Sequence, residues 1–384
     1  MSELNASNLR KEHGNEGPDL VGTTELTSPY FMVPPSGTTA ERPQNPQPGT
    51  LRFNTDIGSL EFYRGDTIGW ESIDRVSPNL GGGTGSNAGT GARVVFAAGN
   101  DGSGSDVIDY VTVSTLGNAQ DFGDTTAATS RPSGTASSTR GLINGGQVSA
   151  SMVNTIEFIT LSSTGDATNF GDLTLARWYP SGHANQTRSV TGGGYTPNYN
   201  TNIMEYVTIA STGDAKDFGD LTVARREHSS GSSSTRGIFA GGQTSPQTPG
   251  GVYNTIDYIT TSSTGNAADF GDLSPVMGSS ATATNSTRML LAGGLTPGAV
   301  NYIQYITIAT TGNAADFGDL LSARGLLAIG VASDKTRGLF AGGNAPSNVI
   351  EYVQILTTGN SLDFGDLSAA RYTAAAMSNA HGGL

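Results

Sequence analysis

The chain has 384 residues, and its 20 Lys and Arg against 33 Asp and Glu give a formal net charge of −13. This balance disfavours binding to nucleic acid or to an anionic membrane surface, because both need clustered Lys and Arg. Cysteine is absent and no apolar run approaches the ~18 residues of a membrane span, so we expect no disulfides, no cysteine-ligated metals, no signal peptide and no membrane insertion.

Three segments precede the repeats. Residues 1–28 are polar and predict an extended arm. Residues 29–76 predict a small β-hairpin module, with strands at 50–54 and 59–63, a turn at 54–58 and Trp70 nearby. A hairpin of this size is not stable alone, so we expect it to pack on the arm or on a neighbouring subunit of a homo-oligomer. Residues 77–91 are rich in Gly and predict a flexible linker.

A repeat fills residues 92–384. The tripeptide Phe-Gly-Asp occurs six times, at intervals of 48, 48, 52, 47 and 47 residues. Its Phe and Asp residues are Phe122, Asp124, Phe170, Asp172, Phe218, Asp220, Phe270, Asp272, Phe317, Asp319, Phe364 and Asp366. Five copies also contain a Thr-Arg pair, and these arginines are Arg140, Arg188, Arg236, Arg288 and Arg337. Chance cannot produce such a frame, so the repeat is the unit of the fold.

Four short apolar segments alternate with turn-forming residues within each copy. Near the end of the chain they are an Ala-rich segment at 374–376, a segment ending in Gly-Gly at 338–343, an alternating segment at 350–355 and the Phe-Gly-Asp segment at 363–367. This pattern is typical of consecutive antiparallel strands of about five or six residues. Four strands in each repeat of nearly 50 residues predict one blade of a β-propeller.

The two ends of the repeat region are complementary. The first copy begins near residue 92 with its second strand, whereas residues 372–380 follow the last copy and match a first strand. Pairing of these two segments would complete a sixth blade and leave no unpaired edge. We therefore predict an all-β fold in which residues 92–384 form a six-bladed β-propeller closed by the C-terminal strand.

The repeat frame resembles that of kelch proteins. It combines an Arg, an Ala-rich strand, an aromatic strand and a strand that ends in Gly-Gly, which occurs at 145–146, 192–193, 241–242, 293–294 and 342–343. Where kelch blades normally have a Trp, this chain has the Phe of Phe-Gly-Asp. The resemblance covers residues 92–384 and implies a kelch-like propeller.

The N-terminal segment resembles virion structural proteins of tailed bacteriophages, particularly cyanophages. It carries Arg-Pro at 42–43, Pro-Gly-Thr-Leu-Arg-Phe-Asn-Thr at 48–55, Glu-Phe-Tyr at 61–63 and Trp70. Repeats that end in Asp-Phe-Gly-Asp-Leu are also similar to ones in these proteins. The resemblance implies location in the virion, attachment to other virion proteins through residues 1–76, and display of the propeller as a tail-fibre, neck or capsid appendage.

The Phe-Gly-Asp segment has a structural and a functional interpretation. We expect its Phe to fill the space between blades, its Gly to allow a turn, and its Asp to accept hydrogen bonds from the backbone or from an Arg. The partner would be a Thr-Arg arginine or one of those after the segment, which are Arg131, Arg177, Arg225, Arg324 and Arg371. Calcium binding by the Asp pairs stays open as an alternative, although the spacing of a typical calcium loop is missing.

Catalytic residues are not expected. The four histidines, His13, His183, His228 and His381, lie in predicted loops or termini without metal-binding spacing, so we expect them to be solvent-exposed. Acids recur on the third strand, at Asp109, Glu157, Glu205, Asp257 and Glu351. Since catalysis normally needs asymmetry, this repetition indicates structure rather than a hydrolase site. We predict no enzyme activity, no cofactor and no metal.

The longest inserts between second and third strands, residues 195–202 and 243–253, give a candidate ligand surface. They carry Tyr195, Tyr199 and Tyr253, and loops on a rigid ring suit recognition of a partner. We expect a non-enzymatic virion protein that binds a host-surface glycan or receptor, or decorates the particle. Two alternatives stay open: a free kelch-type protein that binds protein or carbohydrate, and a propeller enzyme that degrades polysaccharide.

Overall fold

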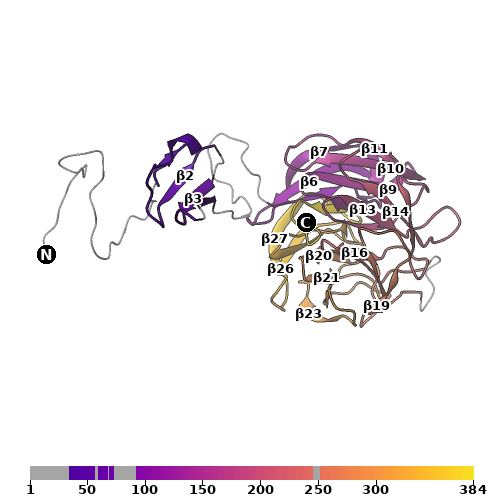
Figure 1. The fold of residues 1–384 in the computed structure, drawn as a ribbon. Coiled ribbons are helices and arrows are strands. Elements are labelled where there is room, and N and C mark those ends of the chain that lie inside the picture. Colours follow the sequence, from indigo (N-terminus) through magenta and orange to yellow (C-terminus); the bar gives the residue numbers. More distant parts are fainter. Residues whose placement is uncertain (1–33, 57–58, 68, 73–91, 245–250) are drawn as a thin grey trace. The chain divides into compact units, whose positions relative to one another are not determined.

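The structure is a computed structural model that describes residues 34–56, 59–67, 69–72, 92–244 and 251–384 (Figure 1). The chain divides into two compact units, Met1–Ser77 and Pro78–Leu384, and each is described by itself. The predicted arm at 1–28 and the predicted linker at 77–91 lie outside the described residues. Within the described ranges, no helix is long and apolar enough to cross a membrane.

The first unit contains one small sheet with the strand order β1-β2-β3-β4. Its elements are β1 (Ser36–Gly37), the 3-10 helix η1 (Thr39–Glu41), β2 (Leu51–Asn54), β3 (Ser59–Tyr63) and β4 (Trp70–Ser72). The expected hairpin is present as the antiparallel pair of β2 and β3, in which Leu51 lies opposite Phe62. Two further strands extend it: β1 pairs with β2 in parallel, and β4 pairs with β3.

The two faces of this small sheet carry different side chains. One face buries Glu61, which forms ion pairs with Arg42 and Arg52 and accepts a hydrogen bond from Asn54. The other face carries the apolar side chains Leu51, Phe53, Leu60 and Phe62. None of these four is fully buried. The unit therefore has a buried ion-pair network on one face and a partly exposed apolar surface on the other.

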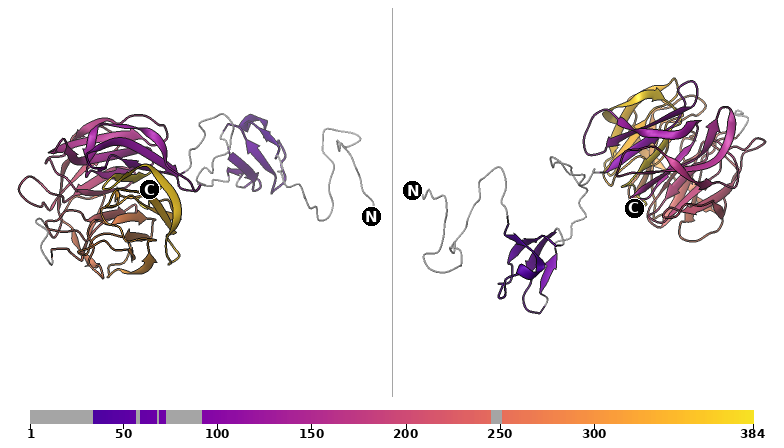
Figure 2. Two further views of the ribbon diagram at one scale, coloured as in Figure 1. Left: turned by 180° about the vertical axis from the view of Figure 1, so that it is seen from behind. Right: turned by 90° about the horizontal axis from the view of Figure 1, so that it is seen from above.

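The second unit is built from short strands in several sheets (Figure 1, Figure 2). Three sheets have four antiparallel strands each, in the orders β12-β13-β14-β15, β16-β17-β18-β19 and β20-β21-β22-β23. Their strands are β12 (Ser181–Ala184), β13 (Arg188–Gly192), β14 (Ile203–Thr208), β15 (Lys216–Asp220), β16 (Ser229–Ser232), β17 (Arg236–Ala240), β18 (Thr255–Thr260), β19 (Ala268–Asp272), β20 (Ala281–Thr284), β21 (Arg288–Ala292), β22 (Tyr302–Thr307) and β23 (Ala315–Asp319). The prediction of an all-β fold with four strands in these repeats is confirmed, and each sheet is consistent with a propeller blade.

The remaining repeats form a three-stranded and a nine-stranded sheet. The first contains β25 (Arg337–Ala341), β26 (Ser347–Gln354) and β27 (Leu362–Arg371). The second contains β5 (Arg93–Ala97), β6 (Ser105–Thr112), β7 (Gln120–Ser130), β8 (Ser133–Ala136), β9 (Arg140–Val148), β10 (Ser151–Thr160), β11 (Thr168–Asp172), β24 (Ile329–Gly330) and β28 (Ala375–Ser378). The nine-stranded sheet contains two groups of four strands, β28-β5-β6-β7 and β8-β9-β10-β11. A short antiparallel pairing between β7 and β9 joins the two groups. Strand β28 is antiparallel to β5, with Ala375 opposite Ala97, and parallel to β24.

One backbone contact recurs between successive repeats. The N–H of a turn glycine donates to the carbonyl oxygen of the Phe in a neighbouring Phe-Gly-Asp segment, at 2.7 to 2.9 Å. The pairs are Gly165 with Phe122, Gly213 with Phe170, Gly265 with Phe218, Gly312 with Phe270, Gly359 with Phe317, and Gly117 with Phe364. The glycine of Phe-Gly-Asp is required here, because Gly365 has φ +148° and a Cβ would lie 2.4 Å from the Gly117 oxygen. The last and first repeats thus share the contact found between the other neighbours.

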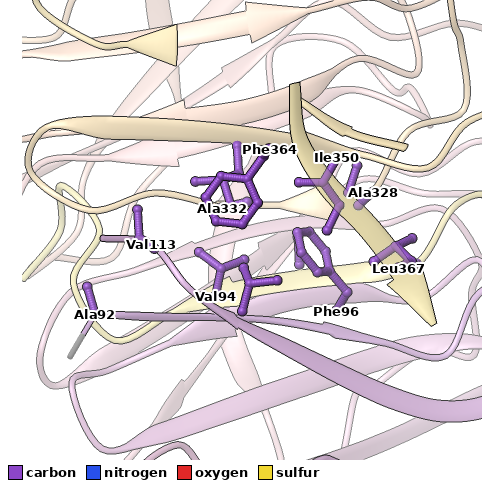
Figure 3. Close-up of a cluster of buried hydrophobic side chains, with 14 residues drawn as sticks. Ala92, Val94, Phe96, Val113, Ala328, Ala332, Ile350, Phe364 and Leu367 are labelled. Atoms are coloured by element: carbon purple, nitrogen blue, oxygen red, sulfur yellow. The ribbon is translucent and has the colours of Figure 1, made fainter. Parts of the chain in front are cut away.

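The Phe side chains of these segments are buried between neighbouring sheets. Phe364 packs in one cluster with Val94 and Phe96 of β5, and Leu339 of β25 belongs to the same cluster (Figure 3). Each of the six Phe rings also meets an aromatic ring of the third strand edge-on, at centroid distances of 5.9 to 6.0 Å. Such pairs stabilise packing beyond the apolar area that they bury. The main apolar core of this unit therefore lies between its sheets.

The predicted hydrogen bonds between the Thr-Arg arginines and the Asp of Phe-Gly-Asp are wrong within the described residues. Each guanidinium instead stacks on a third-strand aromatic ring and donates to a backbone carbonyl of another repeat, and Arg337 near the end of the chain donates to Val113 near its start. Arg188 lies 4.3 Å from the Tyr206 ring and donates to the Thr261 oxygen at 3.0 Å. The other stacks are Arg140 on Phe158, Arg236 on Tyr258, Arg288 on Tyr305 and Arg337 on Tyr352. A flat guanidinium can cover a ring while its in-plane N–H groups reach carbonyls.

The other predicted partners of this Asp, the arginines that follow Phe-Gly-Asp, are also wrong within the described residues, because four of them pair with third-strand acids and Arg131 donates to Gln147. Buried ion pairs join Arg177 to Glu205, Arg225 to Asp257, Arg324 to Glu351 and Arg371 to Asp109, at 2.6 to 3.1 Å. One repeat has Met277 in place of the Arg, and there Gln304 replaces the acid and donates to Met277 Sδ at 3.1 Å. Arg131 is not an equivalent, because it lies seven rather than five positions after its Asp. These four acids therefore neutralise buried arginines.

Candidate functional site

One residue in each repeat adopts the left-handed backbone conformation two or three positions before a short strand, namely β8, β12, β16, β20, β24 or β28. These six connector residues are Arg131, Tyr179, Glu227, Ser279, Leu326 and Thr373, with φ between 50° and 62°. Neighbouring members are joined, since Tyr179 N donates to the Arg131 oxygen at 3.0 Å and Ser279 N to the Glu227 oxygen at 2.7 Å. The conformation costs about 1–2 kcal/mol for each residue other than Gly. The fold therefore holds these segments together at one end of the strands despite local strain.

The residue before each connector lies beside the loop between the second and third strands. Trp178 forms a backbone bridge with Tyr195, and Arg226 forms the equivalent bridge with Gln243. Both partners directly follow a glycine turn whose residues have positive φ. This local geometry brings side chains from two distant sequence positions to the same end of a sheet.

Three neighbouring repeats place arginines and aromatic rings in contact at this end. The Arg131 guanidinium lies 4.6 Å from the Trp178 ring. Trp178 stacks on Tyr195 with a centroid distance of 5.8 Å and an interplanar angle of 22°. Arg226 lies 5.4 Å from the Tyr195 ring, and both guanidinium groups lie within 6.0 Å of Tyr179. We refer to Arg131, Trp178, Tyr195 and Arg226 as the arginine–aromatic stack.

Glu227 is a buried carboxylate beside this stack. It is 5% exposed and accepts hydrogen bonds from Gln243 Nε2 and Ser279 Oγ, while Arg226 Nε lies 3.4 Å from it. Burial raises the pKa of Glu227, and the Ser279 hydrogen bond and the Arg226 charge partly oppose that rise. Burial, with a contribution from Glu227, raises the pKa of Tyr179 to about 12. The site thus combines two arginines with one buried acid that is held inward.

The equivalent positions elsewhere carry small or uncharged residues. The other connectors are Ser279, Leu326 and Thr373, and the residues before them are Gly278, Gly325 and Tyr372. The backbone conformation is the same in all six repeats, so the framework does not require arginines or large aromatic rings at these positions. This departure from the repeat marks the arginine–aromatic stack as the candidate functional site.

A small cavity lies next to Glu227. Tyr179, Ser279 and Thr373 line it together with Glu227 and Leu327. Its volume of about 10 Å³ is far below the ~300–1,000 Å³ of sites for organic ligands. A ligand of that size would therefore bind on the stack and the neighbouring loops rather than inside this cavity.

The structure separates the three predicted rim tyrosines. Tyr195 belongs to the stack, and Tyr199 lies in the same loop with 56% of its surface exposed. Tyr253 lies in the corresponding loop of the next sheet, where its N–H donates to the Gly242 oxygen. The described contacts do not join Tyr253 to the stack, and residues 245–250 of its loop lie outside the described residues. One of the three predicted residues is thus part of the cluster, and a second is close to it in sequence.

Several residues of the site were missing from the predicted surface, namely Arg131, Trp178, Tyr179, Arg226 and Glu227. Their signal in the sequence is the pair of residues six and seven positions after the Asp of Phe-Gly-Asp. At these positions the chain has Trp-Tyr and Arg-Glu in two adjacent repeats, against Gly-Ser and Gly-Leu in the next two. A position-by-position reading of the repeats could have found them.

The prediction that the histidines are solvent-exposed is wrong for three of them. His183 on β12, His228 beside β16 and His381 near the last residue are at most 2% exposed. Burial lowers the pKa of His183 to about 3 and that of His381 to about 4. These histidines are buried because the first strands of the sheets pack against other strands and against the C-terminal residues. Side chains in these contacts are shielded from water. His13 lies outside the described residues.

Residues 379–384, the C-terminal tail, close the opposite end of the first strands. His381 Nε2 lies 2.8 Å from the Ala136 oxygen and Nδ1 accepts a hydrogen bond from Gly383 N, so the ring is neutral with its proton on Nε2. Gly382 N donates to Thr284 Oγ1. Ala136 and Thr284 are the last residues of β8 and β20, whereas the connector residues precede first strands. The tail and the arginine–aromatic stack therefore lie at opposite ends of these strands.

The chemistry available at the stack is that of a binding surface: guanidinium N–H groups, aromatic rings and one inward-facing carboxyl group. Across the described part of the chain, no three His, Asp or Glu side chains gather in a cluster that could hold a metal ion. A scan of protein families finds no match for this chain, and a search of curated proteins finds none either.

Proposed function

We propose that this protein is a non-enzymatic structural protein of a tailed-bacteriophage virion, whose propeller binds a host-surface glycan or receptor. The binding role is carried by one observation: the arginine–aromatic stack is the place where a repeated framework departs from its own pattern. The virion location is supported by the resemblance of residues 38–70 and of the Asp-Phe-Gly-Asp-Leu repeats to phage structural proteins. Attachment to the particle would use residues 1–76.

The propeller is proposed to be a six-bladed, kelch-like ring closed by residues 372–380. Three contacts between the last and first repeats support closure: the pairing of β28 with β5, the hydrogen bond from Gly117 to Phe364, and the ion pair of Arg371 with Asp109. The latter two have counterparts between successive repeats along the chain. A closed ring would hold the connector residues rigidly, which lowers the entropy lost on ligand binding.

Assembly into a homo-oligomer, or onto other virion proteins, is supported by the first unit. Its sheet leaves Leu51, Phe53, Leu60 and Phe62 incompletely covered while it buries charged groups on the opposite face. Apolar surface of this kind commonly marks a protein interface. The propeller would then be presented in several copies on one particle.

Binding without turnover is proposed because of the number of carboxylates at the site. Glycoside hydrolysis generally uses two carboxyl groups about 5–10 Å apart. Glu227 is the one carboxylate among the residues that line the cavity. Asp109, Glu205, Asp257 and Glu351 are buried in ion pairs with arginines. This distribution favours a ligand-binding role over hydrolysis.

The proposal is tested on purified phage particles. Mass spectrometry and gold-labelled antibodies should find the protein on the particle, at the capsid, neck or tail. A chain that lacks residues 1–76 should fold and yet fail to co-purify with particles. Detection of the protein only in the soluble fraction, or incorporation of the truncated chain, would contradict virion attachment. Turnover of a polysaccharide by the isolated protein would favour the enzyme alternative.

A further inference from the structure

We propose that the arginine–aromatic stack binds an acidic carbohydrate, a sugar that carries a carboxylate, through the guanidinium groups of Arg131 and Arg226. This inference rests on the proposed function and names the ligand class of the same site. The observation behind it is that these guanidinium groups differ from the other stacked arginines in their hydrogen bonds and in their surroundings.

The stacked arginines differ in their hydrogen bonds. Arg188 stacks on Tyr206 and donates a terminal N–H to the Thr261 oxygen at 3.0 Å, which uses the group within the protein. Arg226 also stacks on a tyrosine, but among the described residues its terminal nitrogens donate no hydrogen bond. Its polar contact is the ion pair of Nε with Glu227. A flat guanidinium with unused in-plane N–H groups matches the two oxygens of a carboxylate.

Arg131 completes the cationic side of the site. One of its terminal nitrogens donates to Gln147, and the guanidinium covers Trp178 at 4.6 Å. The Nε atoms of Arg131 and Arg226 are both buried, and neither makes a hydrogen bond in the described structure, although Arg226 Nε lies 3.4 Å from Glu227. These donors hold positive charge in a low-dielectric environment, where an anionic group nearby is stabilised more than in water. Arg131 and Arg226 therefore frame a site for a negatively charged ligand.

The local charge at the site differs in sign from the net charge of the chain. The chain has a net charge of −13, yet the stack contains two arginines and has one acid, Glu227, beside it. Glu227 is turned toward Gln243 and Ser279, and one carboxyl group cannot balance the charge of two guanidinium groups. In physiological salt the Debye length is about 8 Å, so a bound ligand responds to these nearby charges more than to distant acids.

The aromatic side chains at the site favour a sugar over a small inorganic anion. Trp178 and Tyr195 are partly exposed between the arginines, and Tyr199 in the adjoining loop is 56% exposed. Aromatic side chains offer an apolar surface with a polar group at one end, which suits the C–H groups and hydroxyls of a sugar ring. An inorganic anion would use the arginines and leave these aromatic rings without a role.

The experiment uses Trp178 as a reporter. The chain has two tryptophans, so full-length protein with Trp70→Phe isolates the fluorescence of Trp178. It is titrated with uronic-acid oligosaccharides from alginate and from polygalacturonate, and with the carboxyl-reduced form of each. We expect a fluorescence change with the acidic oligosaccharides that weakens at high salt, and binding at least about tenfold weaker for the reduced forms.

Matched variants locate the site. Arg226→Gln and Arg131→Gln should each weaken binding of the acidic oligosaccharides at least about tenfold, whereas Arg188→Gln, at the other end of the sheets, should leave it unchanged. Circular dichroism checks that each variant is folded. Equal affinity for acidic and reduced oligosaccharides would overturn the ligand class and leave a glycan-binding role intact. Absence of any fluorescence change would overturn the inference, while virion attachment is decided separately by co-purification through residues 1–76.

Discussion

The two ends of the strands in the second unit use the same side-chain chemistry for different purposes. At one end, Arg188 and its equivalents stack on third-strand rings and donate to carbonyls of another repeat, and the contact recurs from repeat to repeat. At the other end, Arg131 and Arg226 stack on aromatic rings in one sector, and Arg226 keeps terminal N–H groups unused within the described residues. Contacts that recur hold the sheets together, whereas the contacts that break the repeat are the ones that we propose bind a partner.

The largest effect is expected from a recurring contact in the interior. Arg225→Met removes the charge that faces Asp257 at 3.1 Å, and both side chains are fully buried. Because an unpaired buried carboxylate remains, the free energy of unfolding should fall by about 3–5 kcal/mol. Urea-induced unfolding at neutral pH measures this loss.

A double variant tests the reason for that loss. Arg225→Met combined with Asp257→Gln copies the natural pair of Met277 and Gln304, in which the amide donates to sulfur and accepts from Ser274 N. We expect the double variant to recover most of the stability. A double variant as unstable as Arg225→Met alone would show that charge pairing is not what the recurring Arg provides.

Acid should weaken the end of the strands that the C-terminal tail closes. The pKa of His381 falls from 6.5 to about 4 on folding, so the unfolded chain binds more protons between these values. The contribution of His381 to the free energy of unfolding is therefore fully present above pH 6.5. It falls by about 3 kcal/mol as the pH drops toward 4. His183, whose pKa falls to about 3, adds a loss in the same direction.

Urea unfolding at pH 7.0, 5.5 and 4.5 should show this decline, and His381→Gln should make it shallower. An unchanged pH dependence in that variant would rule out His381 as a source.

A moderate effect is expected where a recurring arginine links two repeats. Arg188→Gln removes the stack on Tyr206 and the charged hydrogen bond to Thr261. The free energy of unfolding should fall by about 1–2 kcal/mol. Calorimetric melting against the unaltered protein measures the change. A loss of unfolding free energy below the error of the measurement would mean that these stacked arginines do not stabilise the contact between repeats.

The smallest effect on stability is expected at the arginine–aromatic stack. Arg226→Gln removes an ion pair in which Nε lies 3.4 Å from Glu227. Gln243 and Ser279 still donate to Glu227, and loss of the nearby positive charge raises its pKa further, so the carboxyl group can take up a proton. We expect a loss of about 1 kcal/mol or less. A loss as large as that of Arg225→Met would show that Arg226 is part of the core.

Repetition explains why the framework could be predicted from the sequence. Phe-Gly-Asp and the Gly-Gly turns recur at similar intervals, so the pattern of each strand occurs in several copies. The strand can therefore be predicted even where one copy departs from the pattern. The partners of the arginines could not be predicted in this way. Arg188 donates to Thr261, 73 residues further on in another sheet. Sequence spacing alone does not choose between such a carbonyl and a nearby Asp, because both satisfy a guanidinium.

The site could be predicted only in part, for the opposite reason. The length of its loop predicted Tyr195 as a site residue. Trp178 and Arg226 occupy positions that differ from repeat to repeat, so a comparison based on recurring residues does not identify them. The burial of His183 and His381 also depends on contacts between distant segments. His183 packs against Phe239 of another sheet, and His381 is held by Ala136. These contacts exist only after the sheets have come together.

The most direct test measures melting temperature and binding of acidic oligosaccharide on the same two variants, Arg188→Gln and Arg226→Gln. If recurring contacts serve structure and the unrepeated stack serves recognition, Arg188→Gln will melt at the lower temperature and bind like the unaltered protein. Arg226→Gln will melt at a higher temperature than Arg188→Gln and bind at least about tenfold more weakly. Equal loss of binding in both variants, or undiminished binding in Arg226→Gln, would contradict this division between the two ends of the molecule.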